Sequence, residues 1–430
     1  MAMVVKNNMS AISTLNTLNK NSSALSKSLQ KVSSGMKING AADDASGYAI
    51  SERMRVQIRG LDQANQNTQN GSSMMKVAEG AVSSTVDILK TLKEKVINAA
   101  NDTNTDADRQ TIQKELDQSI DQINDNANVT YNGKYLVDGS HNSKVSATTT
   151  SMTNQSLNTS TVFASTFASL TDRNGNSLNI QSTDTITFSY VKEGKTTTVR
   201  VSGESTFANL IAAVSTDLTT GTADSVIGQD VAGDTVYTAD GASALTIKAN
   251  GTGVEKQISG ITFSVTDTKG NVKKSANALL DNFSESIRAQ NKSDDNSINL
   301  QVGTKSNQAI KVGLTDMRAE ALGLQAQNGK TLNISTKEYA NAAINVLDSA
   351  VQKALDQQTT IGAVQSRLEY TSSNLTTASE NVQASESTIR DADMAKEMTN
   401  YTKNNVLMQA AQAMLSQANQ SSSSVLSLLQ

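Results

Sequence analysis

The stretch MKVAEGAVSSTVDILKTLKEKVINA, from Met75 to Ala99, decides the fold class because its apolar residues recur every seven positions. The two columns of this repeat are Met75, Val82, Leu89 and Val96, and Ala78, Thr85, Leu92 and Ala99. Two filled columns at this spacing are typical of a helix that packs along a second helix. The sequence therefore predicts a long helix here, with a partner elsewhere in the chain.

The C-terminal part of the chain carries a matching repeat. Its two columns are Leu368, Leu375, Val382 and Ile389, and Val364, Thr371, Ala378, Ser385 and Ala392. Two such seams, one from each end of the chain, predict a long antiparallel coiled-coil-like rod. Leu116 and Ile123 indicate a third helix between them, over residues 106–127.

Local signals indicate where these helices begin and end. Thr105 with Asp108, and Ser335 with Glu338, have the capping-box spacing, which predicts helices over residues 106–127 and 336–385. Gly35 is expected to end the first helix of the chain, because glycine readily adopts the left-handed conformation that stops a helix.

The composition suits long helices. The 430 residues include no Pro, although an average chain of this length would have about twenty. Pro breaks helix interiors, so its absence favours uninterrupted helices. There is no Cys and no Trp, and aromatic residues make up 3% of the chain. Disulfides and thiolate metal sites are therefore excluded, and aliphatic cores are expected.

The middle of the chain has a different pattern. Asn132-Gly133 separates two short runs of strand-forming residues, which predicts a hairpin with a type I′ turn. Further strands are expected at 185–190, 196–201, 245–249, 261–266, 298–302 and 310–312, with a short helix at 207–214. Ser, Thr, Asn, Asp and Gly dominate between these runs, so the middle is predicted to be a β-rich domain with many loops.

The two ends of the chain are amphipathic and carry few charges. Residues 404–430 include no charged side chain. The apolar positions of both ends are Leu15, Leu18, Leu25, Leu29, Val32, Val406, Leu407, Met414, Leu415, Leu426, Leu428 and Leu429. An isolated helix from either end cannot bury these apolar side chains, so we expect both ends to be unstable until they pack against a partner helix.

No catalytic residues, cofactor site or metal site are predicted. The single histidine, His141, lies in a Gly-Ser-His-Asn loop, which excludes a two-histidine metal helix and a Ser-His-Asp triad. The stretch Gly323–Thr331 is similar to a phosphate-binding loop but has five residues between its glycines instead of four, so it is interpreted as a turn. Asp294–Asn296 is too short for a calcium loop.

Charge and hydropathy limit the possible partners and location. The net charge is −4 and no dense Lys/Arg block occurs, so no nucleic-acid partner is expected. No stretch approaches a membrane span, and residues 1–15 do not have the pattern of a secretory signal peptide. If the protein is exported, it is expected to leave without a cleaved signal peptide.

Particular residues at both ends resemble those of bacterial flagellins. In the N-terminal part they are 29–39, 41–54 and 57–61, continued by Ala78–Ala81 and Tyr131–Gly133. In the C-terminal part they are 316–323, 361–369, 389–395, 417–420 and 425–429. The resemblance covers residues 1–140 and 296–430, whereas residues 141–295 match no family pattern.

The resemblance implies a multidomain α+β protein whose helical ends and variable β-rich middle build a motility filament. The expected divisions are 1–40 and 386–430 for the filament-core helices, 41–140 and 296–385 for the rod domain, and 141–295 for the outer domain. The implied partners are further copies in a helical homopolymer, an export chaperone on the C-terminal helix, the filament cap and the hook-associated proteins. The implied location is the extracellular flagellum, reached through the flagellar type III apparatus.

One stretch departs from the family pattern. In many flagellins the helix that an innate Toll-like receptor reads carries Leu-Gln-Arg-x-Arg-Glu-Leu, and here the equivalent is Leu89–Lys95. The altered epitope comprises Thr91, Lys93, Glu94, Lys95 and Glu115. Thr91 and Lys95 replace an Arg and an apolar Leu, so weakened receptor activation is expected, unless Lys90 and Lys93 compensate.

Other functions remain open from sequence alone. A hook–filament junction protein shares the helical ends, and a flagellin whose middle domain is catalytic is a hypothesis from another class. The Ser- and Thr-rich middle could also bind host surfaces or carry glycans.

Overall fold

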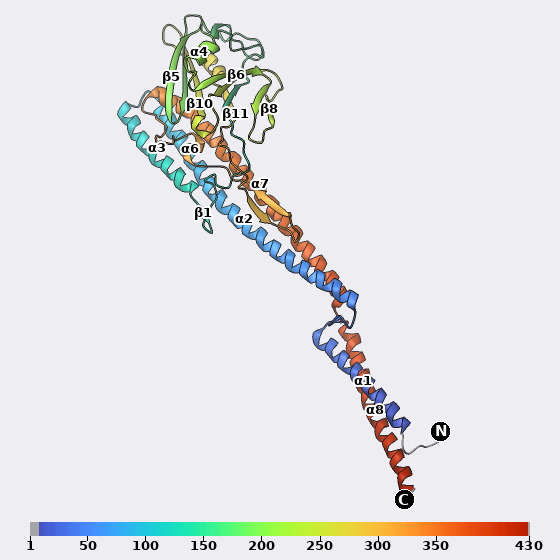
Figure 1. Cartoon of the computed structure of the whole chain (residues 1–430). Helices are drawn as coiled ribbons and strands as arrows, with labels where there is room; N and C mark the ends of the chain where they lie inside the picture. The colour runs from blue at the N-terminus through green and yellow to red at the C-terminus, as the bar shows by residue number, and fades with distance from the viewer. Residues whose placement is uncertain (1–7, 429–430) are drawn as a thin grey trace. The chain divides into compact units, whose positions relative to one another are not determined.

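The computed structural model describes residues 8–428, in which long helices precede and follow a strand-rich middle along the chain (Figure 1). The helices are α1 (Met9–Ser34), α2 (Ala45–Ala99), α3 (Asp106–Ala127), α4 (Phe207–Ala213), α5 (Lys274–Leu280), α6 (Ala319–Leu322), α7 (Lys337–Arg390) and α8 (Met394–Leu428). The predicted fold class, α+β with helical ends and a β-rich middle, is confirmed.

The chain forms two compact units. One comprises the chain up to Asn67, Gln301–Gln308 and everything from Tyr370 onward, and it holds α1, α8 and the adjoining ends of α2 and α7. The other comprises Thr68–Leu300 and Ala309–Glu369. Below they are called the terminal unit and the outer unit.

In both units α2 and α7 run antiparallel, as the repeats predict. In the outer unit Lys93 pairs with Asp348, and Gln365 Nε2 donates to Glu79 Oε2 at 2.7 Å. In the terminal unit Ser372 Oγ donates to Asn65 Oδ1 at 2.7 Å, and Ser379 Oγ to Asp62 Oδ1 at 3.1 Å. As the residue number rises along α2 it falls along α7, which defines the antiparallel direction.

Two helix ends follow the local signals, and both ends of α7 differ from the prediction. Thr105 and Asp108 form a complete capping box at α3, and Gly35 ends α1 with a φ of 69°. The predicted cap at Ser335 is wrong. Helix α7 begins at Lys337, and the hydroxyl of Thr336 accepts from the N–H of Tyr339 at 3.3 Å.

The two residues of that predicted box have other partners. The N–H of Ser335 donates to Asn333 Oδ1 at 2.8 Å, and Glu338 pairs with Arg200 at 2.8 Å. A turn closed by Asn333 therefore takes the place of the cap. Helix α7 also runs five residues beyond the predicted end, so the division proposed at residue 385 lies inside the helix.

The strands form small antiparallel sheets. Their bounds are β1 (Thr130–Tyr131), β2 (Lys134–Tyr135), β3 (Ser151–Asn154), β4 (Thr185–Lys192), β5 (Lys195–Ser202), β6 (Leu218–Asp224), β7 (Val226–Gln229), β8 (Thr235–Tyr237), β9 (Ala244–Ala249), β10 (Ile258–Thr266), β11 (Phe283–Ile287), β12 (Ile298–Gln301) and β13 (Ala309–Val312). The main sheets have the strand orders β10-β4-β5 and β11-β3-β9-β6. The predicted hairpin at Asn132-Gly133 is confirmed, with φ values of 49° and 77°.

The core of the β domain, residues 141–295, combines aromatic rings with aliphatic side chains, which corrects the expectation of aliphatic cores throughout. All six phenylalanines of the chain lie in this domain. Phe167, Phe188, Phe207 and Phe263 are fully buried, and the rings of Phe167 and Phe207 lie 4.4 Å apart. Phenylalanine is thus concentrated in one place, where tilted ring pairs stabilise the packing.

Three loops of the β domain share the same hydrogen-bonded turn. Asp172, Asp230 and Asp267 each open a turn in which their Oδ1 accepts from the backbone N–H groups two and four residues later, at 2.8–2.9 Å. A glycine with positive φ follows three residues after each aspartate, at 87°, 91° and 83° respectively. Each loop is therefore closed by its own side chain.

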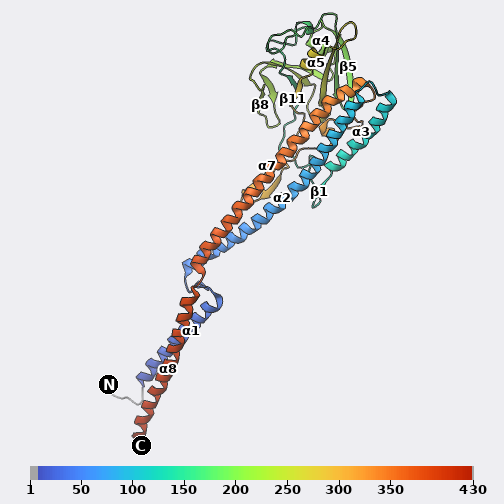
Figure 2. The same cartoon turned by 180° about the vertical axis from the view of Figure 1, so that it is seen from behind.

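The β domain packs on the N-terminal half of α7, as both views show (Figure 2). Gly260 makes this approach possible, because a Cβ there would lie 2.9 Å from Val346 Cγ2 and 3.0 Å from its backbone nitrogen. Beside it, Asn345 Nδ2 donates to the carbonyl of Ile261 at 2.9 Å. Lys353 and Glu285, each with a side chain 7% exposed, form a buried ion pair at 3.4 Å.

Candidate assembly surfaces

The terminal unit pairs α1 with α8, and this pair leaves most of its apolar surface uncovered. Polar contacts set the antiparallel register. Asn8 Nδ2 donates to the Ala418 carbonyl at 3.1 Å, and Asn21 Nδ2 to the Leu407 carbonyl at 3.2 Å. Between the two helices only small side chains are buried in the described part of the pair, namely Ser28 at 6% and Ala411 at 7% exposure.

The residues predicted for filament-core packing divide into two groups. Leu18, Leu25, Val32 and Leu415 are half-buried. Leu15, Leu29, Val406, Leu407 and Met414 are exposed, with values from 42% to 62%. Leu426 and Leu428 lie in α8 with side chains outside the described part, and Leu429 lies outside the described residues. Their role in packing between copies stays a prediction.

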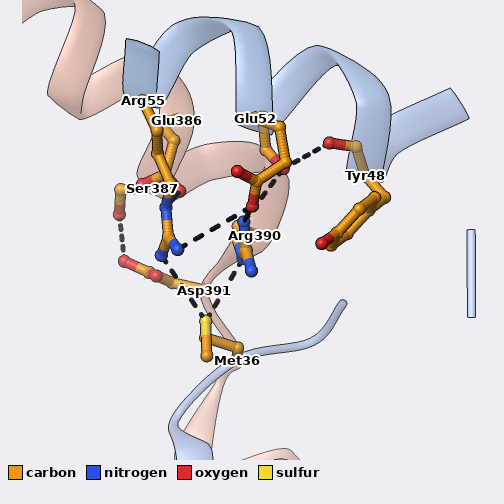
Figure 3. A network of polar contacts seen from close by, with 9 residues as sticks. Met36, Tyr48, Glu52, Arg55, Glu386, Ser387, Arg390 and Asp391 are labelled. Atoms are coloured by element: carbon orange, nitrogen blue, oxygen red, sulfur yellow. Dashed lines mark hydrogen bonds and ion pairs between the residues drawn. The ribbon is translucent and has the colours of Figure 1, made fainter. Parts of the chain in front are cut away.

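The turns at the base of the pair are held by Arg390, at the end of α7 (Figure 3). Its guanidinium is buried and donates to Glu52 Oε1 at 2.6 Å and to the sulfur of Met36 at 3.2 Å. It also lies 5.3 Å above the ring of Tyr48. Arg390 therefore joins α7, the α1–α2 turn and the start of α2.

A second arginine extends this network. Arg55 Nε lies 2.9 Å from Glu386 Oε1, and Glu386 is 9% exposed (Figure 3). The hydrogen bond from Arg390 holds the pKa of Glu52 below its usual range. Sequence reasoning missed this network. Met36, Glu52 and Arg390 lie within the stretches that carried the family resemblance, whereas Arg55 and Glu386 lie outside them. The spacing of charges on two distant helices gives no signal of which pairs will meet.

The residues predicted for the rod seam lie between the helices. Met75, Val82, Leu89, Val96 and Leu368 are fully buried in the outer unit. In the terminal unit the seam is looser, since Leu375 is 9% exposed and Val382 and Ile389 are half-buried. The helices thus pack most tightly in the outer unit.

In the receptor-like stretch Thr91 and Glu94 are exposed on α2, and the lysines already have partners. Lys95 Nζ lies 3.0 Å from Glu115 Oε1 on α3, and Lys93 pairs with Asp348 on α7. Thr91 is exposed and its hydroxyl donates to the Asp87 carbonyl at 3.0 Å. Glu94 is also exposed.

Metal ligation and membrane crossing find no support within residues 8–428. No group of three or more His, Cys, Asp or Glu there could hold a metal ion, and no helix there is long and apolar enough to cross a membrane. His141 is in a loop, where its Nδ1 lies 3.2 Å from the Asn296 carbonyl. The stretch Gly323–Thr331 forms a turn closed by a bridge between Gln325 and Thr331, as predicted.

Two cavities lie where the β domain meets α7. One, of about 250 Å³, is bordered by Arg288, Arg318 and Lys353, and the other, of about 280 Å³, by Glu285, Asn345 and Asp348. These charges are paired among themselves or with close neighbours: Lys353 with Glu285, Arg288 with Asp356, and Arg318 with Asp316. These ion pairs balance most of the charge at the cavities, and Lys292, which also borders the first one, forms no ion pair within residues 8–428.

Both ends of the chain match known protein families. Residues 5–142 match the bacterial flagellin N-terminal helical region, and residues 344–429 match the bacterial flagellin C-terminal helical region. A flagellin of Clostridium tyrobutyricum is 36% identical over 97% of this chain and 99% of its own length. A flagellin of Bacillus subtilis is 32% identical over 99% of this chain and 100% of its own. Among solved structures, the flagellar hook associated protein-3 of Legionella pneumophila covers 78% of this chain and 97% of its own, at 14% identity and a TM-score of 0.34.

Proposed function

The chain belongs to the bacterial flagellin family, and from this membership we propose that its two ends drive filament growth by becoming stable only when copies stack. The protein is a structural subunit of the bacterial flagellar filament. In the proposed mechanism the α1–α8 pair forms only part of a hydrophobic core. The exposed apolar side chains of one copy are covered by those of its neighbours, and the loss of apolar surface from water supplies the free energy of growth.

One observation carries this proposal. In the terminal pair, Leu29, Val406 and Met414 are 51%, 59% and 62% exposed, whereas the contact between the helices buries mainly Ser28 and Ala411. A helical pair with so small a core is marginal alone, because ordering its backbone costs about 1–2 kcal/mol per residue. Burial in a polymer would offset that cost, whereas the dilute monomer would not order its ends.

The direct test removes the apolar face and keeps the helix. The double substitution Val406→Gln with Met414→Gln is expected to stop elongation on filament seeds. The matched control, Gln409→Ala with Gln412→Ala, changes two exposed polar positions of α8 and should elongate normally. A chain lacking residues 404–430 should also fail to elongate. Normal elongation of the Gln variant, measured by sedimentation and electron microscopy, would contradict the proposal.

We also propose how the protein reaches the filament. Export unfolded through the flagellar type III apparatus suits a chain without Cys and without Pro, because neither disulfide formation nor slow proline isomerisation delays folding at the tip. An export chaperone would cover the charge-free segment 404–430 before export, and the filament cap would receive it. Co-purification of a chaperone with the full chain, but not with the chain lacking 404–430, tests this step.

Receptor activation is proposed to be weak. The carboxylate of Glu115, which would serve as a receptor contact, already pairs with Lys95 at 3.0 Å. Lys95 also stands where an apolar side chain would anchor the receptor, and Thr91 lacks the donors of an arginine. Both replacements remove side chains of the kind that dominate interfaces.

Restoring the family residues tests this idea. Thr91→Arg with Lys95→Leu is expected to raise potency in a reporter-cell assay, whereas Ser84→Arg, at another exposed position of α2, should not. If the unmodified chain is already as potent as a flagellin with the full motif, Lys90 and Lys93 compensate and the proposal is wrong.

A further inference from the structure

The part of the terminal unit formed by α2 and α7 also leaves a surface without a partner. Its core is small, with Leu61, Ala64 and Leu375 buried. On the opposite sides of the two helices, Val56 of α2 is 61% exposed and Tyr370 of α7 is 75% exposed. Tyrosine is among the residue types that are enriched in protein interfaces, and a tyrosine ring this exposed on a long helix is therefore a candidate contact.

The surroundings of Val56 suit an aromatic ring. At 100° per residue, Arg53 and Arg59 lie 60° to either side of Val56 on α2. Both arginines are exposed, and neither forms an ion pair within the part of the chain that the structure describes. The methyl groups of Val56 provide an apolar surface for a tyrosine ring, and guanidinium groups stack favourably on the face of such a ring.

We propose that Tyr370 of one copy docks on Val56 of a second copy, between Arg53 and Arg59, and that this contact links neighbouring subunits of the filament. The proposal rests on the filament function and adds the surface through which two α2–α7 segments meet. In the proposed arrangement each copy offers Tyr370 to one neighbour and Val56 to another, so the contact is heterologous. A heterologous contact can repeat from copy to copy without closing, which an open filament requires.

Photo-crosslinking tests the contact in the assembled polymer. Tyr370 is replaced by the photoreactive amino acid benzoylphenylalanine, which keeps an aromatic ring, and the variant is diluted tenfold into ¹⁵N-labelled wild-type protein. After irradiation of sedimented filaments, the crosslinked peptides should contain ¹⁵N-labelled residues 53–59. The matched control carries the same group at Gln352, an exposed position of α7, and should not react with that segment.

The result separates this inference from the filament function. Absence of sedimentable polymer from wild-type protein would overturn the filament function itself. Polymer whose crosslinks map away from 53–59, or only within one copy, would overturn the contact alone. Crosslinks between two copies at position 370 would also overturn it, since they indicate a symmetric contact.

The contribution of the ring is measured separately. Tyr370→Ala is expected to raise the critical concentration for polymerisation about tenfold, which corresponds to about 1.4 kcal/mol. Tyr370→Phe should stay close to wild type, because the ring and not the hydroxyl makes the proposed contact. The 75% exposure of Tyr370 means that neither change should alter the melting of the monomer, which circular dichroism checks. An unchanged critical concentration for Tyr370→Ala would refute the proposal.

Discussion

Replacing Asp281 by Asn is expected to stabilise the β domain at neutral pH. The carboxylate follows α5 beside the aromatic core, and Oδ1 accepts one backbone hydrogen bond, from Phe263 at 2.5 Å. Burial raises its pKa from 3.8 to about 6, and the single hydrogen bond offsets this only in part. Asn keeps the shape and the acceptor but carries no charge to desolvate.

The magnitude follows from the pKa. A rise of about two units corresponds to roughly 3 kcal/mol between the charged and neutral forms. The imperfect match of an amide to the site reduces the expected gain to about 2 kcal/mol. For a domain of this size, that gain raises the melting temperature by roughly 4–8 °C.

The pH dependence has a definite sign. The folded-state pKa of Asp281 is above the unfolded value, so the folded state binds the proton more tightly. The wild-type β domain should therefore lose stability as the pH rises from about 4 through 6, and Asp281→Asn should lack this loss. Calorimetric melting of both proteins between pH 4 and 7.5 measures the difference, which should vanish at the acid end.

Asp267 provides the matched control. It lies in the same domain, but hydrogen bonds from Asn271 hold its pKa below the usual range. Asp267→Asn should therefore destabilise the domain at neutral pH, in the opposite direction. An equal melting difference for Asp281→Asn at pH 4 and pH 7.5, or a carboxyl carbon resonance of Asp281 that titrates near 3.8, would refute the reasoning.

Two further substitutions test the polar contacts that join the elements. Lys353→Ala leaves the buried Glu285 with only its longer contact to Arg288, at 3.8 Å, and should cost about 3 kcal/mol, whereas Lys353→Met with Glu285→Leu should recover most of that loss in denaturant titrations. Arg390→Gln removes the cation between Glu52 and Met36, so faster hydrogen exchange is expected at residues 35–44 and 391–393, with unchanged exchange in the β domain.

Much of the helical architecture follows from the sequence because the repeat is strong. The columns through Val82 and Leu368 have the period of packed helices, and both side chains are fully buried. Gly35 and Thr105 act through neighbouring backbone groups, so their roles can be predicted from a few residues. The cap at Thr336 was missed because Asn333, outside the capping box, engages Ser335.

The β domain shows where such reasoning fails. Strand β3 reads Ser-Met-Thr-Asn and has no apolar alternation, yet all four residues are buried. Tertiary partners satisfy the polar groups: Thr153 hydrogen-bonds to Thr246 across the sheet at 3.0 Å, and Asn154 Nδ2 donates to the Leu279 carbonyl at 2.8 Å. A polar strand at the centre of a sheet is recognisable only when its distant partners are known. The arginine network around Met36 was missed for the same reason.

The self-closed loops of the β domain have a practical consequence for engineering. In the loop that Asp267 opens, the carboxylate fixes the backbone, and Thr268 and Lys269 at the tip are exposed. A foreign peptide could be grafted between these two residues, in the connection from β10 to α5, and the insertion would separate Asp267 from the N–H groups of Lys269 and Asn271 that close the loop. A filament built from such a chain would display the graft once per subunit, as a dense multivalent array suited to vaccines or immobilised enzymes.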